Sequence, residues 1–482
     1  MIKKKWVGGI ALVCMGALLA GCGSADMSSE SKVDVALEST VNQGENAEKK
    51  AVSDMSEEGA KKTDTTEEAE DAKEADAAEE AKKDSSSEQA EKEKTMTENM
   101  AKEFVLADPM SLKDSYQRAA YFADWAYLQK KENTIISPLS LIVALGLAAE
   151  GASGETAQQL YAYLGREDYT DYVKEYMTFA EGLAVEKGER QYASEYSFHY
   201  EIANSIWINQ KTQIQNDYRD SVTKSFRAEV SPADFDGDVS GTVKKVNGWC
   251  DQKTHGMIPE IITERNIQRG LMAILINSLY FESPWVDRWN LYEGEFTDFQ
   301  GHQTTQEMLT GSGNIYYEND KATAFGKAYY NGFEFIGILP KEEGEFSILD
   351  LDLEGLLASA DTSYDISAKM PKLNFETSAK RVEDLLKSQG VTIPFDISRA
   401  CFDKIVKDQT LYVDSILQKC KIELDENGTK AAAVTAMMMR ANGIAMEKQV
   451  KEVNLNRPFA FLIYDTVNDE ILFVGKVTSI SE

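Results

Sequence analysis

The chain has 482 residues, and its 81 Asp and Glu against 51 Lys and Arg give a formal net charge of −30. This charge, without any basic cluster interleaved with aromatic residues, excludes a nucleic-acid-binding protein, because phosphate contacts need Lys and Arg. Composition divides the chain into an N-terminal quarter rich in Glu, Asp, Lys, Ala, Ser and Thr, and a remainder rich in Ile, Leu, Val, Phe and Tyr. Only the remainder can bury a large core.

Residues 1–21 are expected to be a lipoprotein signal peptide. Three lysines at positions 3–5 precede an apolar run over 6–20, which is too short for a membrane span. The run ends in LAGC at 19–22, which resembles the bacterial lipoprotein box. That resemblance implies lipidation of Cys22 and an extracytoplasmic protein, anchored to the bacterial cell membrane with its domain outside. A plain signal peptide with a chance cysteine is the alternative.

Residues 22–102 are expected to be a lipid-anchored, acidic, low-complexity tether. From 23 to 100 there is no aromatic residue and no proline, so this stretch cannot bury enough apolar surface to fold. A flexible coil of this length spans about 50 Å, enough to lift a domain off a membrane. An acidic tail that binds a partner is the alternative.

The cysteines do not provide a disulfide framework. After the signal, Cys22, Cys250, Cys401 and Cys420 remain, and lipidation of Cys22 would leave three. The folded domain, expected over 103–482, must therefore depend on its hydrophobic core.

Helices are predicted mainly in the first half of this domain. Ser137 before Pro138 is a favourable helix start, and Gly390 closes the last predicted helix. The apolar spacing predicts helices over 114–130, 139–150, 156–164, 243–250 and 381–388.

Strands are predicted mainly in the second half. Runs of β-forming residues predict strands over 200–209, 271–281, 333–340, 365–375, 411–424, 459–465 and 470–477, the last two joined by a turn at 466–469. There is no βαβ alternation, so the fold class is α+β with largely antiparallel or mixed sheets.

The most informative segment is ENGTKAAAVTA at 426–436. Three consecutive alanines are too small for an ordinary buried strand, and the run has too few turn formers for an ordinary surface loop. This composition indicates a segment that can be exposed as a loop and buried as a strand.

Seven segments, in order along the chain, resemble the serpin family. They are NTIISPLS at 133–140, GASGET at 151–156, ANSIW at 203–207, THGMI at 254–258, NSLYF at 277–281 followed by Trp285, KMPKL at 369–373 and NRPF at 456–459. The resemblance implies a serpin fold of about nine helices and three β-sheets, with an exposed C-terminal reactive loop at about 426–453.

The resemblance also implies an irreversible suicide-substrate inhibitor of serine endopeptidases, with cysteine endopeptidases as a further class, and not an enzyme. A protease cuts the reactive loop and forms an acyl-enzyme, and the loop then inserts into the main β-sheet. The partner is a target serine endopeptidase, the membrane is contacted through the lipid anchor only, and the protein is expected to be a monomer. No cofactor or metal is implied.

The hinge of the reactive loop fits insertion because alternate strand residues face opposite sides of a sheet. If Thr429 enters first, Thr429, Ala431, Ala433 and Thr435 face the core and Lys430 faces solvent; a one-residue shift would bury the charge of Lys430. Gly428 gives the pivot backbone freedom. The hinge residues are Glu426, Gly428, Thr429, Ala431, Ala432, Ala433 and Thr435.

The bond that is cut is expected within a window rather than at one position. The window comprises Met439, Arg440, Ala441, Asn442 and Gly443. Met439 suits an elastase- or subtilisin-like protease and Arg440 a trypsin-like one, whereas the Asn-Gly pair also favours a turn. The three methionines at 437–439 are open to oxidation.

The resemblance further implies a polar cluster beneath the opening sheet, formed by Ser137, Ser140, Asn277 and Gln418. Animal members of the family usually carry histidine where Gln418 stands, so the resemblance implies no pH-switch role for this position. Glutamine can still donate and accept hydrogen bonds.

Two other classes of protein are alternatives to an inhibitor. The sequence gives little support to an enzyme, because its three histidines fall in no catalytic motif: His199, His255 and His302. The remaining alternative is a non-inhibitory surface module with a serpin fold that binds a ligand or adheres to a host.

Overall fold

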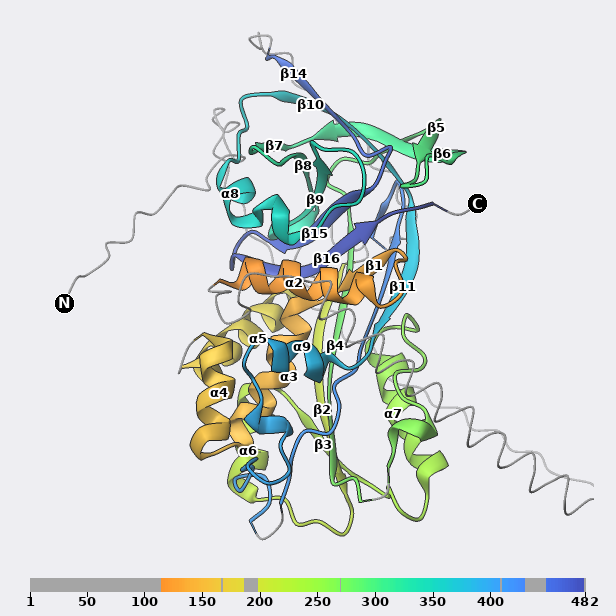
Figure 1. The fold of residues 1–482 in the computed structure, drawn as a ribbon. Helices are drawn as coiled ribbons and strands as arrows, with labels where there is room; N and C mark the ends of the chain where they lie inside the picture. The colour runs from red at the N-terminus through yellow and green to blue at the C-terminus, as the bar shows by residue number, and fades with distance from the viewer. Residues whose placement is uncertain are drawn as a thin grey trace, which may run out of the picture. The chain divides into compact units, whose positions relative to one another are not determined.

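The computed structural model describes residues 114–165, 168–185, 198–268, 270–407, 410–429 and 448–480. The chain divides into two units, 1–79 and 80–482, and every described residue belongs to the second. Within the described ranges this unit contains eight α-helices, against the nine or so expected, and three β-sheets (Figure 1). The α+β prediction is confirmed. The predicted signal peptide and tether lie outside the described residues.

The helices begin at residues whose side chains cap them. The carboxylate of Asp114 accepts from the backbone N–H of Gln117, and the hydroxyl of Ser137 accepts from that of Ser140, with Pro138 in the first turn. The α-helices are α2 (Ser115–Leu128), α3 (Pro138–Gly151), α4 (Gly154–Leu164), α5 (Tyr169–Val185), α6 (Asn216–Ser225), α7 (Val239–Lys253), α8 (Leu353–Ala358) and α9 (Val382–Ser388). Single 3-10 turns lie at Glu264–Asn266, Tyr330–Gly332, Leu349–Leu351 and Ile393–Phe395.

The strands form two six-stranded sheets and one four-stranded sheet. The first has the order β1-β16-β15-β9-β8-β7, with β1 (Thr134–Ile136), β7 (Ile315–Glu318), β8 (Ala322–Ala328), β9 (Phe333–Pro340), β15 (Phe459–Asp465) and β16 (Glu470–Val477). The second has the order β14-β10-β6-β5, with β5 (Asn290–Thr297), β6 (Gln303–Gly313), β10 (Asp365–Pro371) and β14 (Val450–Asn454). The third, called the main sheet below, has the order β11-β12-β13-β4-β2-β3, with β2 (His199–Asn209), β3 (Glu229–Ala233), β4 (Ala273–Pro284), β11 (Leu373–Ala379), β12 (Gln418–Leu424) and β13 (Gly428–Thr429).

Hydrophobic clusters lie on both faces of the main sheet. On one face, Val246 and Trp249 of α7 belong to a cluster with Ile276 and Tyr280 of β4. On the other, apolar side chains of α3 such as Leu141 and Leu145 belong to the principal core. Figure 1 shows α7 and α3 on opposite sides of β2 and β4. The strands β2 and β4 of the main sheet are therefore enclosed between two apolar layers.

The observed strands correct two of the predicted ones. The single strand predicted over 365–375 is two strands, β10 and β11, which belong to different sheets and separate at Lys372. Of the strand predicted over 411–424, only β12 is paired, because its neighbour β11 ends at Ala379, opposite Gln418. Residues upstream of Gln418 instead bond to other segments, for example through the Ile416 carbonyl, which accepts from the N–H of Val382.

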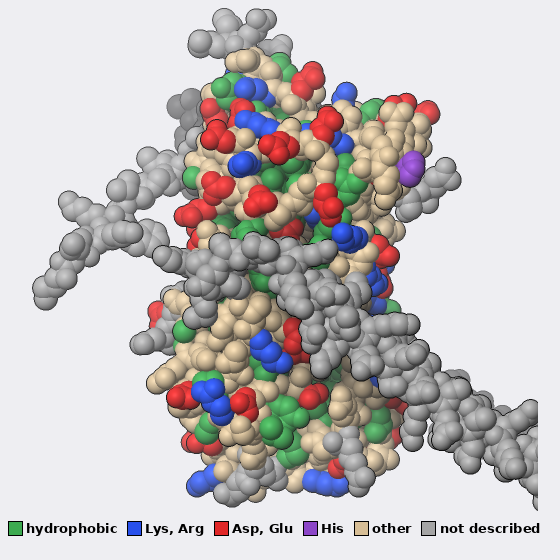
Figure 2. Space-filling view, in the orientation of Figure 1, with side chains coloured by type: hydrophobic (Ala, Val, Ile, Leu, Met, Phe, Trp, Pro, Cys, Tyr) green, Lys and Arg blue, Asp and Glu red, His purple; other side chains and the backbone are tan. Residues whose placement is uncertain are grey.

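Two further properties of the surface and the helices bear on function. Acidic and basic side chains are interspersed on the face drawn in Figure 2. No helix in the described ranges combines the length and apolar character that crossing a membrane requires.

Candidate functional site: a slot in the main sheet

The main sheet contains a slot between β4 and β12. The two-residue strand β13 joins them at one end, where Gly428 pairs with Pro284, and Thr429 pairs with Ser283 on β4 and with Leu424 on β12. Beyond β13, residues 271–281 and 410–422 line a cavity of about 760 Å³. The described part of the sheet thus has room for a further strand.

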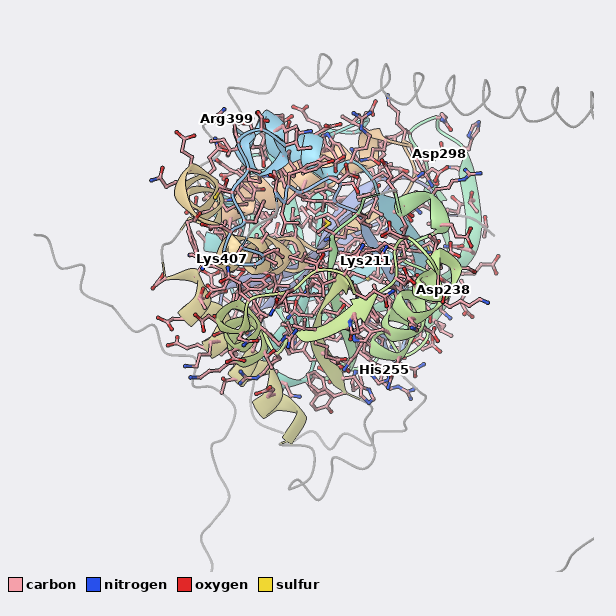
Figure 3. All side chains as sticks on the ribbon, turned by 90° about the horizontal axis from the view of Figure 1, so that it is seen from below. Lys211, Asp238, His255, Asp298, Arg399 and Lys407 are labelled. Carbon is pink, nitrogen blue, oxygen red and sulfur yellow. The ribbon has the colours of Figure 1, made fainter. Side chains whose placement is uncertain are left out.

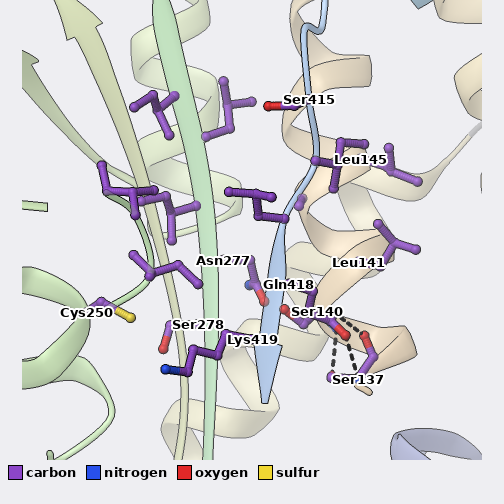
Figure 4. A pocket seen from close by; sticks show the side chains of 18 of the residues that line it. Ser137, Ser140, Leu141, Leu145, Cys250, Asn277, Ser278, Ser415, Gln418 and Lys419 are labelled. Carbon is purple, nitrogen blue, oxygen red and sulfur yellow. Dashed lines mark hydrogen bonds between the residues drawn. The ribbon is translucent and has the colours of Figure 1, made fainter. Parts of the chain in front are cut away.

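The slot is apolar on both faces and carries a few polar groups. Leu141 and Leu145 of α3 line one side, and Met257 and Ile258, which follow α7, line the other. Figure 4 shows Asn277 on β4 and Gln418 on β12 on opposite sides of the slot. The side-chain oxygen of Asn277 and the hydroxyl of Ser278 are buried, and neither has a hydrogen-bond partner among the described residues.

The first hinge residues are held at the closed end of the slot. Thr429 is only 4% exposed, and its hydroxyl lies 2.5 Å from the hydroxyl of Tyr329. The Tyr329 ring stacks on the indole of Trp285, with 4.1 Å between ring centroids. Thr429 therefore lies in an aromatic pocket with room for a small side chain.

A tight turn over 425–428 fixes the direction in which the chain leaves β12. The Asp425 carboxylate accepts from the backbone N–H of Asn427 at 2.7 Å and of Gly428 at 3.3 Å. Trp285 donates twice to this turn, from its indole to the Asp425 carbonyl at 2.9 Å and from its backbone to the Asn427 carbonyl at 3.0 Å. Glu426 forms an ion pair with Lys372 at 3.0 Å.

The predicted polar cluster is only partly assembled. The Gln418 side chain accepts from the Ser137 N–H at 2.9 Å and donates to the Ser137 carbonyl at 2.8 Å, and the Ser137 hydroxyl caps Ser140. Asn277 instead donates to the side chain of Asn204 on β2 at 2.8 Å. Gln418 and Asn277 therefore belong to the two separate walls of the slot.

Several predicted site residues lie outside the described residues. They are Cys22, Ala431, Ala432, Ala433, Thr435, Met439, Arg440, Ala441, Asn442 and Gly443. Conversely, Tyr329, Asp425 and Lys372 contact the hinge, although the sequence pattern does not mark them as parts of the site. The only local signal was the pair of tryptophans, Trp285 and Trp289, that follows β4.

The three histidines lie away from the slot, whereas two cysteines, Cys250 and Cys420, line it. His255 follows α7, on the opposite side of the unit from Arg399 (Figure 3). Burial raises the pKa of Cys250 and of Cys420 to about 12, so both thiols stay protonated at neutral pH. The described residues also hold no group of three or more His, Cys, Asp or Glu arranged for a metal ion.

The main sheet therefore has room for a further strand between β4 and β12, and Gly428 and Thr429 enter that position at one end. The family described as Serpin (serine protease inhibitor) matches residues 119–480. The chain therefore belongs to the serpin family.

Curated relatives come from distant organisms. The chain is 25% identical over 368 residues to Serpin-ZX of Arabidopsis thaliana, covering 73% of this chain and 93% of the relative. It is 27% identical over 374 residues to a serine protease inhibitor of Cyanea capillata, covering 75% and 96%. It is also 28% identical over 356 residues to a serpin-like protein of Thermococcus kodakarensis, covering 72% and 80%.

Solved structures agree with the serpin fold. The thermophilic serpin Tengpin in its native state is 31% identical, with a TM-score of 0.64 over 76% of this chain and 94% of Tengpin. Its latent state is 29% identical, with a TM-score of 0.61 over 77% and 99%.

Proposed function

We propose that this protein is an irreversible suicide-substrate inhibitor of serine endopeptidases, in which the cleaved reactive loop inserts into the slot between β4 and β12. The observation that carries this proposal is that Gly428 and Thr429 already occupy the first positions of the vacant strand. The relative from Cyanea capillata, named a serine protease inhibitor, supports it as well.

The pairing of β13 defines a register for the inserted strand. Both pairings are antiparallel, so each step forward from Thr429 moves one residue back along β4 and along β12. Thr435 would then face Asn277 on one side and Gln418 on the other. Because Thr429 is buried and side chains alternate, Thr435 would point to the same inner face, where its hydroxyl can donate to the unpartnered oxygen of Asn277.

Insertion would be driven by groups that the slot leaves unpaired. The edge of β4 that faces the slot and the extended segment 410–417 would gain a neighbouring strand, with a net stabilisation of about 1 kcal/mol for each new backbone hydrogen bond. Small loop side chains such as Ala431 and Ala433 would enter without displacing α3. The uncleaved protein would accordingly be kinetically trapped.

The chemistry itself belongs to the protease. Its serine hydroxyl attacks the carbonyl of the scissile bond within 439–443, an ester forms, and the new amine leaves with the C-terminal part of the loop. This chain contributes the insertion, which carries the attached protease along the slot before water can cleave the ester. The protein would be consumed in the process and is not an enzyme.

We also propose that the protein acts outside the cytoplasm, held to a bacterial membrane by a lipid on Cys22 and separated from it by the tether over 22–102. The signal-like sequence over 1–21 and the composition of the tether support this placement. Labelling cells with a lipid precursor and comparing the chain with its Cys22→Ser variant tests it, because a chain anchored in another way would label equally in both.

Incubation with elastase, subtilisin and trypsin tests inhibition. An inhibitor gives an SDS-stable complex of higher mass with at least one of them, and the loop-cleaved protein gains thermal stability. Cleavage of the loop without either effect would instead favour a non-inhibitory surface module and would refute the proposal.

A further inference from the structure

Two glutamates, one on β4 and one on β12, flank the position that the chain would occupy directly after Thr429. Because Thr429 pairs with Leu424 and with Ser283, the next residue would, in the same register, face Glu423 on β12 and Glu282 on β4. That next residue is Lys430, the only charged residue between Thr429 and Met439. Insertion in this register would therefore bring the one positive charge of the hinge to the level of two carboxylates.

The side chains of both glutamates belong to the same face of the sheet as the incoming lysine. Thr429, Leu424 and Ser283 are all at most 4% exposed and form the inner layer. Their neighbours alternate to the outer face, the side of the sheet against which α7 packs. Directly opposed residues of an antiparallel pair share a face, so side chains 282, 423 and 430 would point the same way.

Each glutamate is ordered by contacts with other residues. Glu282 is 8% exposed and accepts from the Tyr280 hydroxyl at 2.8 Å, and the same oxygen lies 2.9 Å from the Nδ1 of His199. Glu423 forms an ion pair with Lys421 at 2.6 Å. Burial, then the hydrogen bond and charge of Glu282, and finally the charge of Glu423 raise the pKa of the Tyr280 phenol, so both carboxylates act on one hydroxyl.

We infer that Glu282 and Glu423 are positioning residues that receive the Lys430 ammonium as the loop begins to insert and that fix the register of the new strand. This inference rests on the proposed inhibitory function. A one-residue shift would move Lys430 to the inner, apolar layer, where an unpaired charge is costly. The glutamates favour the correct register, and the inner layer disfavours the wrong one.

The two glutamates should affect the competition between insertion of the cleaved loop and hydrolysis of the acyl-enzyme ester. After acylation, the inhibitor molecules consumed per protease inactivated, minus one, equal the rate of hydrolysis divided by the rate of insertion. A partly exposed ion pair would accelerate insertion roughly two- to fivefold. Glu423→Gln should therefore raise the ratio of the hydrolysis rate to the insertion rate by the same factor. Lys430→Glu should raise it further, since it adds repulsion, and both effects should shrink in 1 M salt.

The decisive comparison is a charge swap in the full-length protein, with trypsin, subtilisin and elastase as the protease probes. The doubly substituted E423K/K430E protein should recover most of the wild-type ratio, whereas either single reversal should not. Glu354→Gln, an exposed acid of α8, is the matched control and should leave the ratio unchanged. Glu282→Gln is the secondary variant, because its burial could perturb folding.

The outcomes separate this inference from the function beneath it. If the E423Q and K430E proteins form stable complexes with an unchanged ratio, the positioning role of Glu282 and Glu423 is refuted. The proposed inhibitory function would not be affected. If the wild-type protein forms no complex, the gain in melting temperature on loop cleavage is compared across the same variants. Equal gains would refute the positioning role of the two glutamates. A wild-type protein with neither a complex nor a gain would overturn both.

Discussion

The two ends of the slot differ in how the sheet is completed. At the hinge end, β13 bridges β12 and β4, Trp285 binds the turn over 425–428, and Tyr329 contacts the hydroxyl of Thr429. At the other end, no strand of the described residues pairs with residues 410–417, and β4 lines the cavity. One sheet is thus closed at the hinge end and open beyond it, so the proposed insertion would begin at the hinge and proceed away from it.

The largest expected effect is at the closed end. Thr429→Arg would place a long cation in the aromatic pocket, where a buried charge without a partner is not tolerated. We expect the variant to be cleaved at a normal rate but to form no SDS-stable complex, as seen on denaturing gels after reaction with the protease that the wild type inhibits. Thr429→Ser keeps the hydroxyl beside Tyr329 and should remain an inhibitor. Unchanged inhibition by the arginine variant would contradict insertion from this end.

The next effect concerns the wall of the open part. Gln418→Leu would remove both hydrogen bonds to the backbone of Ser137 and deprive its N–H of the amide acceptor, whereas its carbonyl keeps the bond from the N–H of Leu141. The expected loss is about 1 to 3 kcal/mol in the free energy of unfolding, measured from urea denaturation of the uncleaved protein. The exposed Gln252 of α7 is the control, since Gln252→Leu should change stability little. Equal stabilities would mean that Gln418 does not hold β12 to α3.

The buried Glu334 of β9, in the first six-stranded sheet, is a control site outside the slot. Its effect on stability should be independent of loop insertion. Burial raises the pKa of Glu334 to about 7 from 4.5, although a hydrogen bond from Tyr317 opposes the shift. The folded state therefore holds this proton more tightly than the unfolded state. The stabilisation is complete below pH 4.5 and is lost as the pH rises to about 7.

Glu334→Gln should accordingly be more stable than the wild type at pH 8, by about 2 to 3 kcal/mol, and should lose the pH dependence between 4.5 and 7. Urea denaturation at several pH values measures both. The number of inhibitor molecules consumed per protease should stay the same, because this sheet takes no part in the proposed insertion. A change in that number would show that the two sheets are coupled.

The smallest expected effect is at the centre of the slot. Thr435→Val keeps the shape of the side chain but removes the hydroxyl proposed to reach Asn277, so the loop-cleaved form should lose about 1 kcal/mol of stability. The uncleaved form should be unaffected, and Thr435→Ser should behave as the wild type. Calorimetry of the cleaved and uncleaved proteins measures the difference, and an equal loss in both forms would place Thr435 elsewhere.

Local sequence patterns were sufficient to predict the helices and strands whose ends carry strong capping or turn signals. The predicted strands over 333–340, 459–465 and 470–477 have the bounds of β9, β15 and β16. Ser137 before Pro138 predicted the start of α3, because a capping hydroxyl and a fixed proline φ favour a first turn. In contrast, α5 is rich in tyrosine and threonine, which favour helices weakly, and it was not predicted.

Features that depend on long-range pairing could not be predicted. β10 and β11 form one continuous pattern but belong to different sheets, and sheet membership is not encoded in alternation. The exposed strands β5 and β6 have too few apolar residues to be recognised. Gln418 was assigned to the polar cluster through the family resemblance, whereas Tyr329 contacts Thr429 from a sequence distance of 100 residues.

The length of β4 limits where a cut can be productive. Ala273 is the first residue of β4, and the register that pairs Ser283 with Thr429 would pair Ala273 with Met439. The strand edge between these ends measures about 33 Å, which is the length of loop that can be paired before the sheet ends. A bond severed well before Met439 would leave the vacancy partly filled, and a bond severed well after Gly443 would leave surplus chain at the far end. Under the proposed mechanism, the fold would thus select among proteases by the position of their cut as well as by the residue they recognise.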